Sequence, residues 1–285
     1  MSATSPVARS RGWAASLALA AGCLLLVAVF FVLLFPWARL RAPLERAAGG
    51  ALGGEVRIGR MSGGLLGLRL EDVRVRRPGE AALRLEAVRV RPALSAAWLR
   101  GVPALAIDAA AWGARVDGTA VLDPAAPGFD GRVDDLDPTV LPAGLLDGDP
   151  PWLGAVDADV DLVAAAAGPR GRLDFEGADG AVAFPGLPFA LPYDRVAGRV
   201  ELADDGIVVE ALALDGPMLS AAAAGRIGPG DPARAPVDLE LTVHRADANV
   251  RDLMERFGIP LGPDGAGRLR IQGSLSRPRV TPLGG

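Results

Sequence analysis

The chain begins with one long apolar run and then changes to a regular alternation of apolar and charged positions. Between Arg11 and Arg39 no charged side chain occurs over twenty-seven residues. A helix that crosses a bilayer needs roughly 20 apolar residues. We therefore expect a transmembrane helix at residues 13–37, preceded by a short N-terminal segment at residues 1–12.

The C-terminal end of the apolar run has the composition of a membrane interface. Aromatic and proline residues are followed closely by arginines, and such side chains gather at the depth of the lipid headgroups. A cleaved signal peptide has a shorter apolar core, roughly 7–15 residues, followed by a small-x-small site. An uncleaved anchor is thus the favoured interpretation, with interface residues Trp13, Phe35, Trp37, Arg39 and Arg41.

The only cysteine leaves another kind of anchor open. Cys23 follows Ala20, Ala21 and Gly22, which resembles a lipidation box. A mature chain that started at Cys23 would, however, keep an apolar stretch as far as Phe35, for which a lipid-anchored protein has no use. We therefore favour a small residue inside a membrane helix.

After the apolar run, the spacing of apolar residues first fits a helix and then fits strands. Apolar residues at spacings of three and four predict a short amphipathic, membrane-proximal helix at residues 38–54, which ends at Gly53 and Gly54. From Glu55 onward, apolar residues alternate with charged or small ones. This pattern predicts a mainly β domain at residues 55–285, built as an elongated, curved antiparallel meander with a few short helices.

An internal repeat supports the meander. The segment LRLEDVRV at residues 68–75 recurs as LRLEAVRV at residues 83–90, and a Pro-Gly turn lies between the two copies. The alternation slips by one residue in each copy, from Leu68 and Leu70 to Val73 and Val75 in the first. A bulge or bend at the slip would keep both sets on one face of the sheet.

The remaining pattern predicts more strands and a few helices. Asp204, Asp205 and Gly206 are a hairpin signal, and Asp247 and Gly258 are the expected cap and stop of a helix at residues 247–257. A short helical piece is also expected at residues 92–101, and a short helix or turn at residues 137–148. Further strands are expected at residues 105–112, 154–165, 170–184, 194–204, 206–216, 218–228, 236–246 and 267–276.

The charge distribution argues against a nucleic-acid partner. Residues 1–100 carry fifteen arginines and six acids, whereas residues 101–285 carry fifteen arginines and twenty-eight acids. The distal part is therefore acidic, while phosphate contacts demand a basic face. The basic part next to the apolar run would suit anionic headgroups, although the same arginines would also fit the solvated faces of strands.

No pattern predicts an enzyme, a metal site or a cofactor. His244 is the only histidine and no cysteine is near it in sequence, so a zinc site or a catalytic dyad is not expected. Asp157, Asp159 and Asp161 resemble the start of a calcium loop but lack its glycine and its final acid. We interpret them as the solvent-facing row of a strand. Asp134, Asp135 and Asp137 are expected in a loop before Pro138.

Alanines are frequent in the expected inner rows of the later strands. The segments DLVAAAAG and LSAAAAGRIG are examples. Small side chains on the concave face of a curved sheet leave room, so an apolar groove there could hold an acyl chain or another strand. A codon bias toward alanine would explain the same composition without a function.

Four segments together resemble the type II secretion system protein N family, also called general secretion pathway protein N. They are FPWARLRAPLE, EVRIGRMSGGLLGLRLEDVRV, RVRPAL and GRLRIQGSLSRPRV, and they follow one another along nearly the whole chain. None of them is a catalytic motif. The LEDVRV strand and the terminal Gly-x-Leu-x-x-Pro also resemble AsmA-like proteins.

The resemblance implies a single-pass protein of the bacterial inner membrane with a cytoplasmic N-terminus and a periplasmic β-domain. Its implied role is that of a non-enzymatic accessory component of the type II protein secretion system, with inner membrane lipids and other secretion-system subunits as partners. It implies no cofactor. The alternative is an AsmA-like groove protein that binds or transfers lipid, with an acyl chain or a whole lipid as its ligand.

Overall fold

The structure is a computed structural model, and it describes most of the chain after residue 37. The described residues are 38–52, 54–64, 67–76, 82–93, 101–123, 125–140, 152–165, 168–183, 190–230, 234–256, 258–274 and 277–283. The expected transmembrane helix at residues 13–37 lies outside these ranges, as does most of the expected helix at residues 92–101. Among the described residues, no helix has the length and the apolar character needed to cross a membrane.

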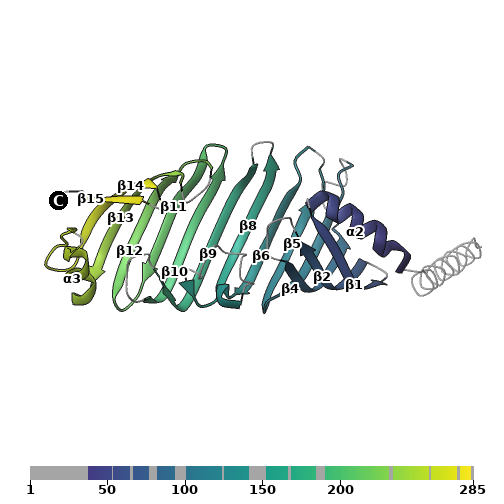
Figure 1. Ribbon diagram of the computed structural model, residues 1–285, viewed down its shortest axis with the longest axis horizontal. Helices are drawn as coiled ribbons and strands as arrows, with labels where there is room; N and C mark the ends of the chain where they lie inside the picture. Colours follow the sequence, from purple (N-terminus) through teal and green to yellow (C-terminus); the bar gives the residue numbers. More distant parts are fainter. Residues whose placement is uncertain are drawn as a thin grey trace, which may run out of the picture.

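The strands form one antiparallel sheet in which nearly every strand pairs with its neighbours in sequence (Figure 1). Fourteen strands follow one another as a meander, and the short strand β7 pairs with β9 beside this path. The strands are β1 (Glu55–Gly64), β2 (Gly67–Arg76), β3 (Leu83–Pro92), β4 (Ala104–Ala111), β5 (Ala114–Val121), β6 (Gly128–Leu136), β7 (Trp152–Leu153), β8 (Val156–Ala165), β9 (Gly168–Val182), β10 (Leu191–Ala203), β11 (Gly206–Asp215), β12 (Leu219–Ile227), β13 (Pro236–Ala246), β14 (Gly267–Ser274) and β15 (Arg277–Pro282).

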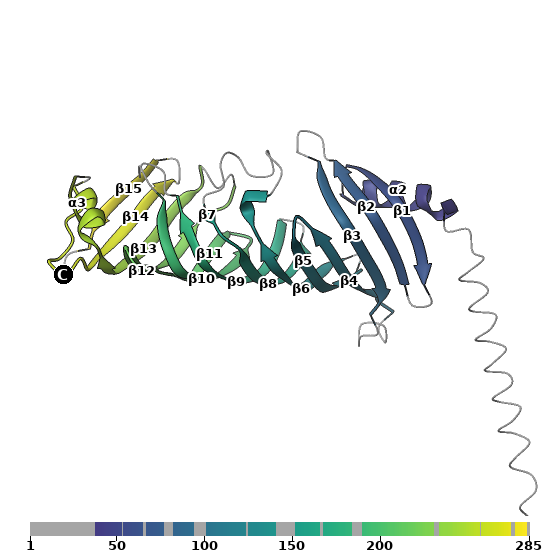
Figure 2. The same ribbon diagram turned by 90° about the horizontal axis from the view of Figure 1, so that it is seen from below.

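The sheet is long, curved and one layer thick (Figures 1 and 2). Helix α2 (Ala38–Leu52) and β1 lie at one end of the long axis, and α3 (Ala248–Arg256) and β15 lie at the other. The only other described helix is a short 3-10 turn, Pro138–Val140. These observations confirm the expected mainly β meander with few short helices.

Helix α2 closes the first end of the sheet. Val56, Ile58, Val73 and Val75 form a buried cluster on β1 and β2, and Leu44 and Ala48 of α2 are among the partly buried residues that pack against it. The spacing of four between these two helix residues puts them on the same side of the helix. The helix expected after the apolar run is thus present, and part of its apolar stripe packs on the sheet.

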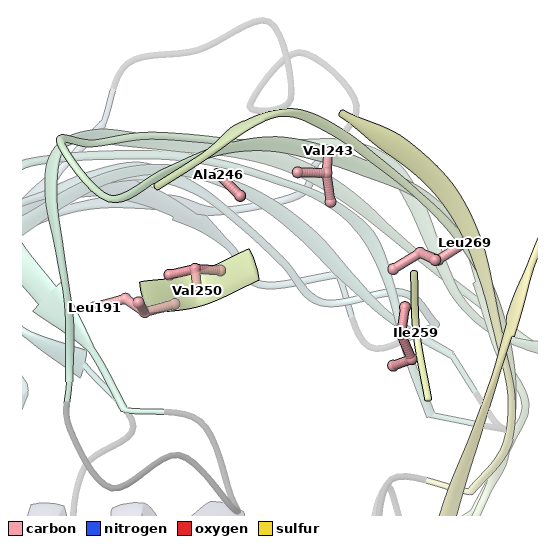
Figure 3. Packing of buried hydrophobic residues seen from close by; sticks show 6 residues of the cluster. All are labelled: Leu191, Val243, Ala246, Val250, Ile259 and Leu269. Carbon is pink, nitrogen blue, oxygen red and sulfur yellow. The ribbon is translucent and has the colours of Figure 1, made fainter. Parts of the chain in front are cut away.

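Helix α3 closes the other end. Its Val250 forms a buried cluster with Leu191 of β10, Val243 and Ala246 of β13, Ile259, and Leu269 of β14. Figure 3 shows the sheet curving around these side chains, with α3 inside the curve.

The ends of α3 match the expected signals. Asp247 accepts a hydrogen bond from the backbone N–H of Val250 at 2.8 Å, as a helix cap does. Gly258 follows the helix with φ +74°, which is the left-handed conformation that favours glycine at this position. The cap and stop read from the sequence are both confirmed.

The slip in the repeated strands is a bend shared by three strands. Asp72 has φ +52°, yet the pairing of β2 with β1 and β3 keeps the same register on both sides of it. The apolar side chains before and after the slip face the same side, because Leu70 packs against the buried cluster that contains Val73 and Ile58. The expected bend is therefore present.

The sequence did not predict four of the strands, which are β5, β6, the short β7 and β15, and one expectation about loops was wrong. β5 and β6 alternate charged residues with glycine and alanine as often as with large apolar ones, so their pattern is weak. Asp134 and Asp135 lie within β6 and not in a loop. Asp135 has φ +58° at a bulge where the register between β6 and β8 shifts. Of the short helix or turn expected at residues 137–148, the described part is the 3-10 turn Pro138–Val140.

Candidate functional site

The most distinctive surface is the apolar face of the middle strands. On this side of the sheet, the pairing places large apolar residues opposite one another or opposite glycine and alanine, so together they form a continuous apolar surface from β4 to β11. Val160 faces Leu173, and Leu173 in turn faces Val200. We call this surface the central apolar face; it consists of Ile107, Val116, Phe129, Val133, Val160, Leu173, Phe175, Val196, Val200 and Leu212.

The central apolar face has no helix packed on it in the described part of the chain. The two buried clusters lie at the ends, under α2 and α3. The residues of the central face are instead half-buried, and Leu212 is 37% exposed. A half-buried apolar surface of this kind marks a place where another apolar molecule gains by contact.

Two phenylalanines pack closely over glycines on this face. A Cβ atom on Gly198 of β10 would come within 2.4 Å of the ring of Phe175 and 3.3 Å of Leu212. A Cβ on Gly118 or on Gly131 would come within 2.7 Å of the ring of Phe129. The rings therefore lie close to the backbone of the sheet, and glycine is the residue that permits this approach.

The opposite face carries charged residues that pair across the strands. Arg132 of β6 lies 3.8 Å from Asp157 and 3.9 Å from Asp159. Arg199 of β10 donates a hydrogen bond to Asp174 and lies 3.8 Å from Glu210. The carboxylates beside these two arginines raise the pKa of each guanidinium, chiefly through hydrogen bonds from Arg132 to Asp134 and from Arg199 to Asp174.

Two shallow hollows lie on this charged face. One is lined by Arg172, Asp159, Asp161 and Glu201 among others, and the second includes Arg132, Asp174 and Arg199. Ion pairs between neighbouring strands occupy much of their lining, as between Arg199 and Asp174. Charged walls of this kind do not suit an apolar ligand. The two hollows are therefore not candidate sites for the apolar ligand that the central apolar face would bind.

The acidic residues considered as metal ligands occupy the solvent-facing row of β8. Asp159 and Asp161 are exposed, and Asp157 accepts a hydrogen bond from the backbone N–H of Asp135 at 2.9 Å. No group of three or more metal-ligating side chains gathers anywhere in the described residues. His244 is exposed near the end of β13, where the register with β12 shifts.

Of the residues expected at the membrane interface, the structure describes two. Arg39 is exposed in the first turn of α2. Arg41 donates hydrogen bonds to the carboxylate of Glu45 at 3.0 Å and to the backbone carbonyl of Gly59 at 3.1 Å. Trp13, Phe35 and Trp37 lie outside the described residues.

The alanines of β12 lie on both faces of the sheet. Ala221 is buried on the apolar side, opposite Leu214 of β11 and Val243 of β13. Ala222 and Ala224 lie on the other side. The alternation in β5 and β6 could have shown that the apolar row continues through them, but the large apolar residues at the matching positions are few, as with Val116, Phe129 and Val133.

Comparison with known proteins adds no relative. No family model matches the chain, and neither the curated proteins nor the solved structures contain a significant match.

Proposed function

We propose that the chain is a non-enzymatic, lipid-handling protein of the AsmA-like kind, whose central apolar face binds acyl chains. The observation that supports this proposal is the continuity of the apolar surface across β4 to β11, with no described helix packed on it. Each methylene group removed from water contributes about 0.8 kcal/mol. An acyl chain lying across these strands would therefore bind without any specific polar contact.

The ligand would lie on one side of the sheet only. The other side carries paired charges such as those of Arg132 with Asp159, which keep that side in water. Helices α2 and α3 cover the apolar face at its two ends, so the length of the bound apolar group is bounded by the strands between them. This arrangement favours a binding site for one or a few acyl chains.

Mass spectrometry of the gently purified full chain tests the proposal. We expect phospholipid to copurify and to be lost from a Leu212→Asp variant, because a carboxylate in contact with an acyl chain is strongly unfavourable. The matched control is Ala213→Asp, the next residue of β11, which is exposed on the charged side. A tenfold fall in lipid affinity would correspond to a loss of about 1.4 kcal/mol in the free energy of binding. A lipid-free wild-type protein, beside a lipid-laden positive control, would refute the proposal.

We propose as a second function an accessory role in type II protein secretion, on the basis of the four resembling segments. In this proposal the chain is a single-pass inner membrane protein whose β-domain meets other secretion-system subunits in the periplasm. Deletion of the gene tests it. Exoproteins should then accumulate inside the cell, and genes for a secretin, an ATPase and pseudopilins should lie nearby. Normal secretion in the deletion strain would exclude this role.

A further inference from the structure

The charged side of the first three strands has an unusual arrangement of like charges. Arg57 of β1 lies directly opposite Arg74 of β2, and Arg74 lies directly opposite Arg84 of β3. A second pair, Arg69 and Arg89, faces across β2 and β3. Like charges directly opposite each other in a sheet are destabilising, so these rows are not explained by the stability of the sheet.

Acids compensate only part of this charge. Asp72 accepts hydrogen bonds from Arg74 at 3.0 Å and from Arg84 at 2.9 Å, and Glu55 pairs with Arg57 at 2.6 Å. The arginines nevertheless stay open to solvent: the side chain of Arg57 is 74% exposed and that of Arg84 is 62% exposed.

Further along β3, Arg89 lies opposite Asp108 of β4 in the strand pairing, and Arg91 lies opposite Ala106. Arg89 and Arg91 make no ion pair with any residue that the structure describes, and both are exposed.

The charge changes sign beyond β3. Like-charged pairs also occur there, but they are acidic, as between Asp108 and Asp117 and between Asp159 and Asp174. The charged side of the sheet is therefore basic at the α2 end and largely acidic after it. A segregated surface of this kind orients the molecule in the field of a charged partner.

The basic strands lie next to α2, and this position indicates which kind of partner their arginines meet. Helix α2 packs on β1 and β2, and α2 begins directly after the long apolar run that ends at residue 37. We propose that the exposed arginines of β1, β2 and β3 dock on an anionic lipid bilayer surface. We call them the arginine face; they are Arg57, Arg60, Arg69, Arg74, Arg76, Arg84, Arg89 and Arg91.

The acidic strands disfavour any other orientation. An anionic bilayer would repel the acidic residue pairs of β4, β5, β8 and β9. The docked molecule therefore holds its β1 end at the membrane and its α3 end away from it. This proposal does not depend on the binding of acyl chains, because the arginine face and the central apolar face lie on opposite sides of the sheet.

Fluorescence quenching in nanodiscs tests the proposal on the full chain. A fluorophore is attached at Ser62→Cys, an exposed β1 position whose partner in β2 is Arg69, in a Cys23→Ser background. The lipids carry a headgroup quencher and are either all phosphatidylcholine or contain phosphatidylglycerol. We expect stronger quenching with phosphatidylglycerol, and its reversal at high salt. A probe at Gln272→Cys on β14 should show no such difference.

Neutral substitutions complete the test. Each arginine near an anionic surface strengthens association about fivefold, so the Arg57→Gln, Arg84→Gln, Arg89→Gln variant should weaken docking roughly 100-fold and abolish the extra quenching. The control replaces Arg226, Arg268 and Arg270 near the other end with glutamine. Circular dichroism verifies folding of both variants. Equal quenching in the two lipid compositions, or extra quenching retained in the first variant, would overturn the proposal.

Discussion

The carboxylate of Glu45 in α2 accepts a hydrogen bond from the backbone N–H of Ile58 in β1 at 2.7 Å. Arg41, one turn earlier in the helix, donates to the carbonyl of Gly59 at 3.1 Å. β1 is the first strand of the sheet, so these two backbone groups lie on an edge that no described strand covers. The helix therefore occupies part of an edge that could otherwise pair with another chain.

Glu45→Ala should loosen α2 from the sheet. Hydrogen bonds to a charged group contribute about 1.5–3 kcal/mol, and the substitution also leaves Arg41 without its carboxylate. We expect faster hydrogen exchange at Ile58, measured by mass spectrometry on peptides that cover β1. Glu86→Ala is the control, because Glu86 is exposed and makes no ion pair with any described residue. Unchanged exchange in Glu45→Ala would contradict the role given to this contact.

The same contact should depend on pH. The hydrogen bond from Ile58 and then that from Arg41 lower the pKa of Glu45 below its ordinary value. A carboxyl group whose pKa is lower in the folded state stabilises the fold fully above its unfolded pKa of about 4.3. This stabilisation is lost as the pH falls through the lower folded value. The difference in unfolding temperature between the wild type and Glu45→Gln should therefore be constant above pH ~5 and shrink in acid.

The edge of the last strand, β15, is protected from pairing with another chain in a different way. Leu283 donates its N–H to the carbonyl of Arg268 in β14 at 2.8 Å, so by alternation Pro278, Val280 and Pro282 direct their backbone nitrogens away from β14. Two of these three positions have no N–H to offer to an added strand. The β15 edge therefore resists pairing with a second chain.

Replacing both prolines with threonine should create a pairing edge. We expect the Pro278→Thr, Pro282→Thr variant to self-associate, measured by light scattering of the purified full chain in detergent over a range of concentrations. Pro260→Thr is the control, since Pro260 is exposed and lies outside the strands. A double variant with the same mass as the wild type at every concentration would show that the prolines do not protect this edge.

The sequence predicted those elements whose local signals agree with the final packing. Asp247 and Gly258 marked the ends of α3 because a cap and a left-handed stop are local properties. β5 and β6 were missed because their alternation uses glycine and alanine, and only their register with β4 and β8 shows that Val116 and Val133 belong to one apolar row. The arginine rows were equally hidden, since the sequence alone cannot show which residues of successive strands lie opposite each other.

The close approach of the Phe175 ring to the backbone of Gly198 in β10 gives a further prediction. Gly198→Ala would place a Cβ atom 2.4 Å from the ring of Phe175, so the ring must move. Overpacking of this kind costs about 1–3 kcal/mol. We expect a lower free energy of unfolding in denaturant, and the Phe175→Leu, Gly198→Ala double variant should recover part of it. A Gly198→Ala protein as stable as the wild type would show that the ring does not depend on this glycine.

The only tyrosine of the chain allows a direct test of burial. Tyr193 of β10 is 2% exposed and donates a hydrogen bond from its hydroxyl to the carbonyl of Leu153 in β7 at 3.1 Å. Burial raises the pKa of this phenol above its ordinary value. Because the chain has no other tyrosine, absorbance at the phenolate band reports on this residue alone.

We expect the phenol to ionise in the folded protein only above its ordinary pKa of about 10, and the unfolded chain to titrate near that value. A group whose pKa is raised on folding stabilises the fold fully below its unfolded pKa, and this stabilisation is lost as the pH rises further. Tyr193→Phe should remove that dependence and cost about 0.5–1.5 kcal/mol through loss of the hydrogen bond to Leu153. A phenol that titrates identically in the folded and the denatured chain would contradict the burial of Tyr193 between β7 and β10.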